Sequence, residues 1–273
     1  MNTSRDKTRP EGHRQARAAL LRTELRSILL EAFDFVQIIN LKERRDRRNE
    51  MDSELRRIGL SLRDDHVELL EASRFPDAGG FASIGARGCF DSHLKALERA
   101  QRLRSRATLI LEDDCDFSNQ IQWTLPFALA ALERTRWSVF YGGRNDWIGR
   151  VRDDSPIAPA SPTDTVLGSH FVAFSSEAVT RLIPFLTAMR ERPAGSPEGG
   201  PMHVDGAYDW FRAAHPQLEA WMANPVLGRQ RPSRTDVHEL KPIERVALAR
   251  NALSLMRRAR RALGKLRKAP GAL

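Results

Sequence analysis

Apolar and polar positions along the chain fall into blocks that predict buried strands separated by helices. Two uninterrupted β-favouring runs, 35–41 and 108–111, have the length and composition of strands that are buried on both faces. Between them, apolar residues recur at helical spacing around 51–58 and from 85 to 103. A weaker strand is predicted at 67–70. Strands that alternate with helices indicate an α/β fold with a mostly parallel sheet.

The second half of the chain continues this pattern less regularly. We predict a helix over 125–136 and short strands at 138–141 and 171–174. Residues 191–202 are rich in Pro and Gly, and we expect them to form a mobile loop that can act as a lid. Because ligands of such sheets bind beyond the carboxyl ends of the strands, we expect the functional site at that rim. The basic segment 42–48, expected as a loop after the first strand, and the acids at 112–116 should share this rim.

The two ends of the chain differ from the middle. Residues 1–33 are polar and basic with a short helical pattern, which predicts an appended helix. Residues 241–273 place Leu and Ala at alternating spacings of four and three with Arg and Lys beside that stripe, which predicts a basic amphipathic helix. This tail holds ten Lys or Arg and one acid, so it carries the whole net charge of +9. Basic and acidic residues balance over positions 1–240, and residues 34–240 remain as one globular domain.

The basic tail has two equally weighted interpretations. It suits peripheral contact with an anionic membrane surface, and it equally suits docking on its own domain with a solvated basic face. Nucleic acid is not expected as a partner, because the tail has no interleaved aromatic residues for base stacking. The sequence has no apolar run of the ~18–20 residues that span a bilayer and no signal-peptide pattern. We therefore expect a cytoplasmic protein that can lie on the inner membrane surface.

The two cysteines, Cys89 and Cys115, are expected to be reduced thiols in packed surroundings. Neither belongs to a CxxC pair or lies near a matching set of histidines in the sequence. A zinc site or a disulfide framework is therefore not expected.

Four carboxylates follow the strand at 108–111 within five residues: Glu112, Asp113, Asp114 and Asp116. Such groups repel one another, and a fold that gathers them at the end of a buried strand usually balances them with a hard divalent cation. Mg²⁺ or Mn²⁺ suits these oxygen ligands, and Mg²⁺ is commonly shared with substrate phosphates. The cluster therefore indicates a phosphate-bearing substrate, although a solvated acidic turn explains it equally well when it is taken alone.

Three segments together resemble a known family. They are Ile38–Leu41 followed by Arg44–Arg48, then Gly85–Leu94, then Leu109–Asp114. In order and spacing they resemble glycosyltransferase family 25, which includes bacterial lipooligosaccharide galactosyltransferases and collagen galactosyltransferase domains. The resemblance is clearest over residues 34–117. It continues more weakly through Gly142–Gly143, Gly168–His170, Val204–Asp205 and Gln230–Asp236.

The resemblance implies a GT-A-type, Rossmann-like fold and a metal-dependent transfer of a sugar from a nucleotide-sugar donor. UDP-galactose or a similar UDP-sugar is the implied donor, and Mn²⁺ or Mg²⁺ is the implied cofactor. A hydroxyl of a glycan or glycolipid precursor, such as lipopolysaccharide, is the implied acceptor. Transfer would invert the anomeric centre, as it does in the galactosyltransferases that the chain resembles.

The resemblance also implies roles for the acidic residues. Asp114 and Asp116 would bind the metal, and Asp236 is a later candidate for metal or diphosphate. Glu112 and Asp113 would hold the ribose or water. The family pattern follows Glu-Asp-Asp with an apolar residue, whereas this chain has a fourth acid two positions on. Which carboxylates touch the metal therefore stays open.

The nucleotide-sugar site implied by the resemblance comprises Asn40, Leu41, Arg44, Arg47, Arg48, Ser92, His93, Glu112, Asp113 and His170. Guanidinium groups can grip a phosphate with two parallel hydrogen bonds. Without the resemblance, the arginines are better explained as the solvated start of a helix. A histidine on a helix face is more often structural, and the histidine before the 171–174 strand can simply cap it.

Inverting transfer requires a general base, for which Asp205 is the first candidate. Asp209, four residues on, could share its helical face, and a helix-capping role is nearly as well supported for Asp205. Two other functions compete with the transferase. A haloacid-dehalogenase-type phosphatase would use Asp114 as nucleophile and Asp116 as acid/base, and a non-catalytic membrane-surface protein would use only the tail.

Overall fold

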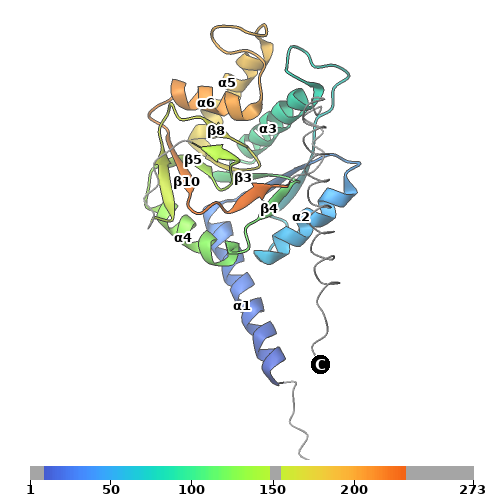
Figure 1. Cartoon of the computed structure of the whole chain (residues 1–273), viewed down its shortest axis with the longest axis vertical. Helices are drawn as coiled ribbons and strands as arrows, with labels where there is room; N and C mark the ends of the chain where they lie inside the picture. Colours follow the sequence, from blue (N-terminus) through green and yellow to red (C-terminus); the bar gives the residue numbers. More distant parts are fainter. Residues whose placement is uncertain (1–8, 148–154, 232–273) are drawn as a thin grey trace, which may run out of the picture. The chain divides into compact units, whose positions relative to one another are not determined.

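A seven-stranded mixed sheet lies at the centre of this computed structural model, which describes residues 9–147 and 155–231 (Figure 1). In spatial order the strands are β2 (Val67–Glu71), β1 (Phe35–Asn40), β3 (Ala107–Glu112), β9 (Phe171–Ser175), β5 (Trp137–Tyr141), β10 (Glu219–Ala223) and β7 (Ile157–Ala160). Strands β2, β1, β3, β5 and β10 run in one direction, while β9 and β7 run against them. The predicted α/β class with a mostly parallel sheet is therefore confirmed.

Helices cover both faces of the sheet (Figure 1). One face carries α1 (Arg9–Ala32), α2 (Arg45–Arg57) and α4 (Ile121–Glu133), and the other carries α3 (Ile84–Arg102), α5 (Ser176–Glu191) and α6 (Val204–Ala214). Successive strand residues point to opposite faces, so Ile38 packs with the first group of helices and Ile39 with the second. Ile110 likewise packs opposite to its neighbours Leu109 and Leu111. Because both faces are buried, these strands read as continuous apolar runs.

Two short two-stranded ribbons are separate from this sheet. One pairs β4 (Cys115–Phe117) with β11 (Gly228–Gln230), and the other pairs β6 (Asp146–Trp147) with β8 (Val166–Leu167). The first ribbon matters for the site, because it carries Gln230 to the acidic end of β3. The Gln230 amide nitrogen lies 3.4 Å from an oxygen of Asp114.

The strands predicted at 35–41, 67–70, 108–111, 138–141 and 171–174 are confirmed. The helices predicted near 51–58 and over 85–103 are also confirmed.

Other elements differ from the prediction. The helix predicted over 125–136 instead spans 121–133, because buried Ile121 adds a turn that faces the core. Residues 45–48, expected in a basic loop, form the first turn of α2, since Arg is a good helix former. Helix α5 and strand β10 were not predicted. No helix in the described ranges is both long and apolar enough to cross a bilayer. The predicted C-terminal helix lies outside the described residues.

Candidate functional site

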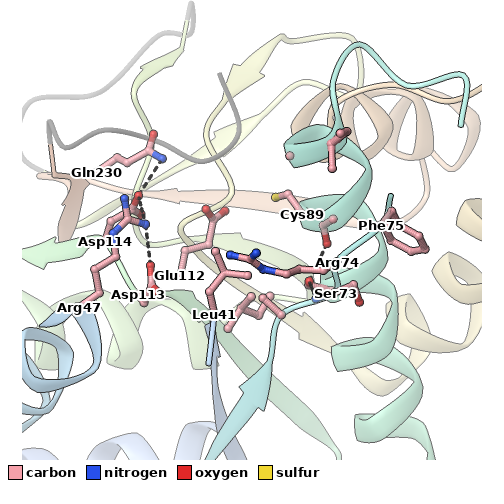
Figure 2. Close-up of a pocket in the computed structure, with 16 residues that line it drawn as sticks. Leu41, Arg47, Ser73, Arg74, Phe75, Cys89, Glu112, Asp113, Asp114 and Gln230 are labelled. Atoms are coloured by element: carbon pink, nitrogen blue, oxygen red, sulfur yellow. Dashed lines mark hydrogen bonds and ion pairs between the residues drawn. The ribbon is translucent and has the colours of Figure 1, made fainter. Parts of the chain in front are cut away.

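A pocket of about 320 Å³ opens at the carboxyl ends of β1, β2 and β3, beside the start of α3 (Figure 2). Parallel strands bring these ends to one rim, where polar side chains from distant segments meet. In Figure 2, Arg47, Asp113, Asp114 and Gln230 lie on one side of the pocket, and Ser73, Phe75 and Cys89 lie on the other. The remaining lining residues are Ile39, Leu41, Ala72, Arg74, Ile84, Gly85, Gly88, Ser92 and Glu112.

On the acidic side of the pocket, the carboxylates carry more negative charge than the neighbouring cationic groups neutralise. Asp113 accepts hydrogen bonds from the Asn40 amide at 2.7 Å and from the Arg47 guanidinium at 2.9 Å. Asp114 is only 3% exposed, and the same guanidinium lies 3.3 Å from its Oδ2. Its Oδ1 is buried with no hydrogen-bond partner among the described residues. An unpartnered buried carboxylate oxygen beside further carboxylates fits a hard divalent cation.

The pKa values of these acidic residues reflect the excess of negative charge. Burial, then the charge of Glu112, raises the pKa of Asp114 to about 7, although Arg47 opposes the shift. Burial also opposes ionisation of Glu112, but the hydrogen bond and charge of His93 outweigh it and lower the pKa of Glu112 to about 2. Without a cation, Asp114 is therefore the carboxylate that holds its proton most readily at this rim.

A buried network positions Glu112 under the pocket. Its Oε1 accepts a hydrogen bond from the Ser169 hydroxyl at 2.6 Å and lies 3.3 Å from the His93 Nε2. The other ring nitrogen of His93 lies 2.9 Å from the hydroxyl of Tyr208, which comes from α6. His93 is fully buried, so it reaches the pocket only through Glu112.

The predicted nucleotide-sugar residues separate into two groups. Five of them line the pocket: Leu41, Arg47, Ser92, Glu112 and Asp113. The other five do not line it: Asn40, Arg44, Arg48, His93 and His170.

Residues of the second group lie behind the pocket wall or at the surface. Asn40 is buried, donates to Asp113 and the backbone carbonyl of Arg44, and accepts from Arg48, so it joins β1 to α2 behind the acids. Arg44 binds its helical neighbour Asp46 at the surface.

Sequence reasoning missed several pocket residues, among them Ser73, Arg74 and Phe75. They directly follow β2, whose carboxyl end shares the rim with β1 and β3. Their position just after a predicted strand was the feature of the sequence that could have identified them as pocket residues. Phe75 contributes an aromatic ring to the pocket lining, and the Arg87 guanidinium lies over this ring, 4.0 Å from its centre.

The segment that carries these residues packs on α3 through a glycine. A Cβ atom on Gly88 would lie 2.6 Å from the backbone carbonyl oxygen of Ser73. Ser92 links the same segment to α3, since its hydroxyl accepts a hydrogen bond from the Ser73 amide at 2.8 Å and donates one to the Gly88 carbonyl at 2.6 Å.

We therefore expect Gly88→Ala to cost about 1–3 kcal/mol in the free energy of unfolding, because backbone must move to admit the methyl group. Gly206 is the matched control. It is also helical, and a Cβ there would meet only the Met202 sulfur at 3.5 Å, so Gly206→Ala should be neutral or stabilising. Urea unfolding monitored by circular dichroism measures both. Equal stabilities for the two variants would contradict the packing argument.

The structure describes two of the three predicted metal ligands, and these two do not share the pocket. Asp114 lines the pocket, but Asp116 does not. The Asp116 carboxylate accepts hydrogen bonds from Arg231, with Nε at 2.9 Å, and that guanidinium also contacts Glu50. Asp236 lies outside the described residues. Metal binding by Asp116 and Asp236 stays a prediction.

The two candidate bases lie on α6 and have different surroundings. Asp209 accepts from the Val166 amide and forms an ion pair with Arg212 at 2.5 Å. Arg212 is 1% exposed and also donates to the carbonyls of Ser161 and Asp164, so this pair anchors a loop on α6. Asp205, in contrast, is only partly buried and accepts solely backbone hydrogen bonds among those found in the described chain.

Asp205 also lies close enough to the pocket wall to act on it electrostatically. Burial raises the pKa of the Cys89 thiol, and the charges of Glu112, Asp205 and Asp114 raise it further. His170 lies nearby, and burial lowers the pKa of its imidazole. Its Nε2 lies 3.4 Å from the Gly228 carbonyl oxygen, so it fills the gap between β9 and β11.

Comparisons with known proteins give partial matches. No protein-family model matches the sequence. Procollagen galactosyltransferase 1-A of Xenopus laevis is 29% identical over 146 residues, which cover 47% of this chain and 23% of that protein. Procollagen galactosyltransferase 2 of Mus musculus is 28% identical over 130 residues, which cover 41% and 21%. The match thus spans less than a quarter of the length of these relatives.

A solved structure is also similar at a low level. It is a glycosyltransferase involved in the glycosylation of the major capsid of PBCV-1, and it aligns with 70% of this chain and 94% of its own. The sequence identity is 10% and the TM-score is 0.34.

Proposed function

We propose that this chain is a metal-dependent glycosyltransferase that moves a hexose, galactose in our proposal, from a UDP-sugar to a hydroxyl of a glycan or glycolipid. The observation that carries the proposal is the buried Oδ1 of Asp114, which has no hydrogen-bond partner among the described residues and lies on the acidic side of a pocket whose lining also includes Phe75. Such a pocket offers separate places for a cation with its diphosphate and for a planar base. The names of the partial relatives support galactosyl transfer, and the resemblance to family 25 supports a GT-A-type fold.

Different residues of the pocket would perform different parts of the sugar transfer. Asp114 would hold Mn²⁺ or Mg²⁺, whose charge stabilises the diphosphate leaving group. Arg47, which already contacts Asp113 and Asp114, can also neutralise negative charge on a bound phosphate. Leu41, Phe75 and Ile84 provide apolar surface for the nucleoside.

We assign the general base to Asp205. It is ionisable, partly exposed and free of side-chain ion pairs in the part of the chain described, whereas Asp209 is committed to Arg212. Asp205 does not line the pocket itself, so the acceptor hydroxyl would lie between this residue and the pocket.

The arrangement disfavours the phosphatase alternative. That mechanism needs Asp114 and Asp116 to face the same substrate. Asp114 lines the pocket, but the pleat of β4 directs Asp116 to Arg231.

We further propose that the acceptor lies at the cytoplasmic face of a membrane. The basic sequence of residues 241–273 supports this location, and lipopolysaccharide-type precursors are acceptors of suitable chemistry.

Calorimetric titration of UDP into the full chain, with and without Mn²⁺, tests the proposed function. We expect binding that depends on Mn²⁺, followed by release of UDP from UDP-galactose when an acceptor is supplied. Metal-independent binding, or no binding of any nucleoside diphosphate, would overturn the assignment. A preference for GDP or CMP would retain the transferase and change the donor.

Asp205→Asn is expected to lower kcat about a hundredfold while leaving the Kd for UDP and Mn²⁺ unchanged, because a general base acts on the acceptor and not on the nucleotide. The comparison variant is Asp209→Asn, which should instead lower the thermal stability by breaking the pair with buried Arg212. Steady-state kinetics and thermal melts separate the two effects. A normal kcat in Asp205→Asn would exclude this residue as the base.

A further inference from the structure

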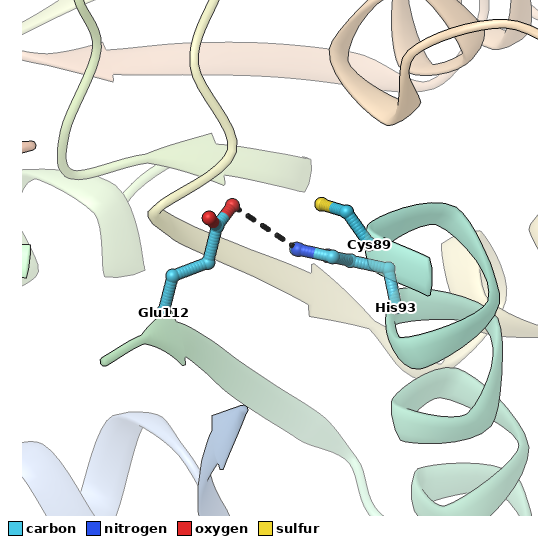
Figure 3. Close-up of side chains that lie close together, drawn as sticks. All are labelled: Cys89, His93 and Glu112. Atoms are coloured by element: carbon cyan, nitrogen blue, oxygen red, sulfur yellow. Dashed lines mark hydrogen bonds and ion pairs between the residues drawn. The ribbon is translucent and has the colours of Figure 1, made fainter. Parts of the chain in front are cut away.

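Cys89, His93 and Glu112 form a cluster on the inner side of the pocket (Figure 3). Their ligand atoms, Sγ, a ring nitrogen and a carboxylate oxygen, all lie within 4.8 Å of one another. Figure 3 shows Cys89 and His93 projecting from consecutive turns of α3 toward Glu112 at the end of β3. This differs from the expectation that neither cysteine has a histidine partner. Residues four apart on a helix lie on the same face, and the sequence already contained that spacing.

The three ligand types favour a different metal from the one proposed at Asp114. Thiolate and imidazole are ligands of Zn²⁺, whereas Mg²⁺ and Mn²⁺ prefer carboxylate, carbonyl and water oxygens. Three protein ligands with an open fourth position are typical of zinc sites that bind water or a further ligand. Cys89 and Glu112 line the pocket, so the fourth position would face it.

The surrounding groups orient two of the ligands. The Tyr208 hydroxyl lies 2.9 Å from His93 Nδ1 and can accept a hydrogen bond from Nδ1–H in the tautomer whose Nε2 has a lone pair directed at the cluster. Ser169 holds the Glu112 carboxylate with a hydrogen bond of 2.6 Å. The His93 Nε2 to Glu112 distance of 3.3 Å is long for a hydrogen bond and close to the separation of two ligands on one tetrahedral zinc ion.

We propose that Cys89, His93 and Glu112 bind one Zn²⁺ ion, separately from the hard-cation site at Asp114. On binding, the Cys89 thiol releases its proton to solvent and forms a sulfur–zinc bond. His93 Nε2 likewise releases to solvent any proton that it shares with Glu112, and the contact between these two residues is replaced by one bond from each to the metal. The site does not depend on the proposed sugar transfer. Zinc bound there would occupy part of the pocket and would therefore compete with its ligand.

Cobalt substitution of the full chain tests the site without an activity assay. Co²⁺ bound to a thiolate gives a strong near-ultraviolet charge-transfer band, which oxygen ligands do not give. Excess Mg²⁺ keeps the carboxylate site filled during the titration. We expect a band that saturates at one Co²⁺ per chain and disappears when Zn²⁺ is added.

The chain has two cysteines, which provide a matched pair of variants. Cys89→Ser should abolish the band, while Cys115→Ala should retain it, because Cys115 is fully buried in the core on the other face of the sheet. Tyr208→Phe should weaken Zn²⁺ binding about 10–100-fold through loss of the orienting hydroxyl. No band in the wild type, or a band that survives in Cys89→Ser, would overturn the proposal.

Alkylation of the wild type provides a measurement that needs no variant. Zn²⁺ should protect Cys89 from iodoacetamide, as located by peptide mass spectrometry, and an unchanged rate of modification would contradict the site. Mn²⁺-dependent UDP binding in the same preparations shows whether the hard-cation site is intact, so failure of the zinc site and failure of the proposed function are distinguishable.

Discussion

Asn in place of Asp114 is expected to abolish Mn²⁺-dependent UDP binding and to reduce sugar transfer by about 10²–10³-fold. The substitution keeps the size of the side chain but removes the charge from the one acid that has a buried oxygen without a hydrogen-bond partner in the described structure. A cation bound there would lose its anchoring ligand, and the leaving diphosphate would lose the charge that stabilises it. Calorimetry with UDP and Mn²⁺, together with transfer assays on the same preparation, measures both effects.

Asp116→Asn is the informative control for this result. It also removes one carboxylate from the Glu112–Asp116 run, but this carboxylate contacts Arg231 and does not line the pocket. We expect it to retain Mn²⁺-dependent binding. If Asp116→Asn lost binding and Asp114→Asn kept it, the metal site would have to be assigned to the β4 ribbon instead of the pocket.

The elements that could be predicted from sequence are those whose local pattern follows from burial. Strands β1 and β3 are central and covered on both faces, so they appear as uninterrupted apolar runs. β10 has the sequence Glu-Ala-Trp-Met-Ala, in which two alanines and a methionine carry little strand preference. Its place depends on pairing with β5 and β7, which is a tertiary effect.

Strand direction could not be read from the sequence either. β9 has the same apolar character as β3 and β5 but lies antiparallel between them. Nothing local to Phe171–Ser175 distinguishes the two directions, because burial on both faces gives the same composition in either case.

The candidate site was predictable to the extent that it lies at the ends of predicted strands. The acids after β3 and Arg47 after β1 were expected to share a rim, and the Arg47 to Asp113 distance of 2.9 Å confirms this. The difference between Asp114 and Asp116 was not predictable, because it depends on Arg231, more than a hundred residues away. Likewise, the Asn40 amide is suited to bind a ligand, but it donates its hydrogen bonds to Arg44 and Asp113 behind the pocket wall.

In the metal-free protein, stability is expected to fall as the pH rises from about 4 to about 7. The folded-state pKa of Asp114 is raised to about 7 from the ordinary value of 3.8, by burial first and then by Glu112. Over this interval the folded chain keeps a proton that the unfolded chain has released. Folding is therefore favoured at low pH, and that contribution is lost as the pH rises through the folded pKa. This rise in the pKa of Asp114 corresponds to at most about 4 kcal/mol in the free energy of unfolding.

The comparison of wild type with Asp114→Asn isolates this contribution, because the amide does not titrate while the other acids remain in both proteins. The lowered pKa of Glu112, about 2, affects stability only at more acidic pH. In urea unfolding with EDTA, we expect the variant to gain stability relative to the wild type between pH 5 and pH 7.5. Mn²⁺ should then stabilise the wild type more at pH 7.5 than at pH 5, because the cation binds the deprotonated carboxylate. Parallel stability curves for the two proteins would show that Asp114 is already ionised at pH 5, and the case for an uncompensated charge in the pocket would fail.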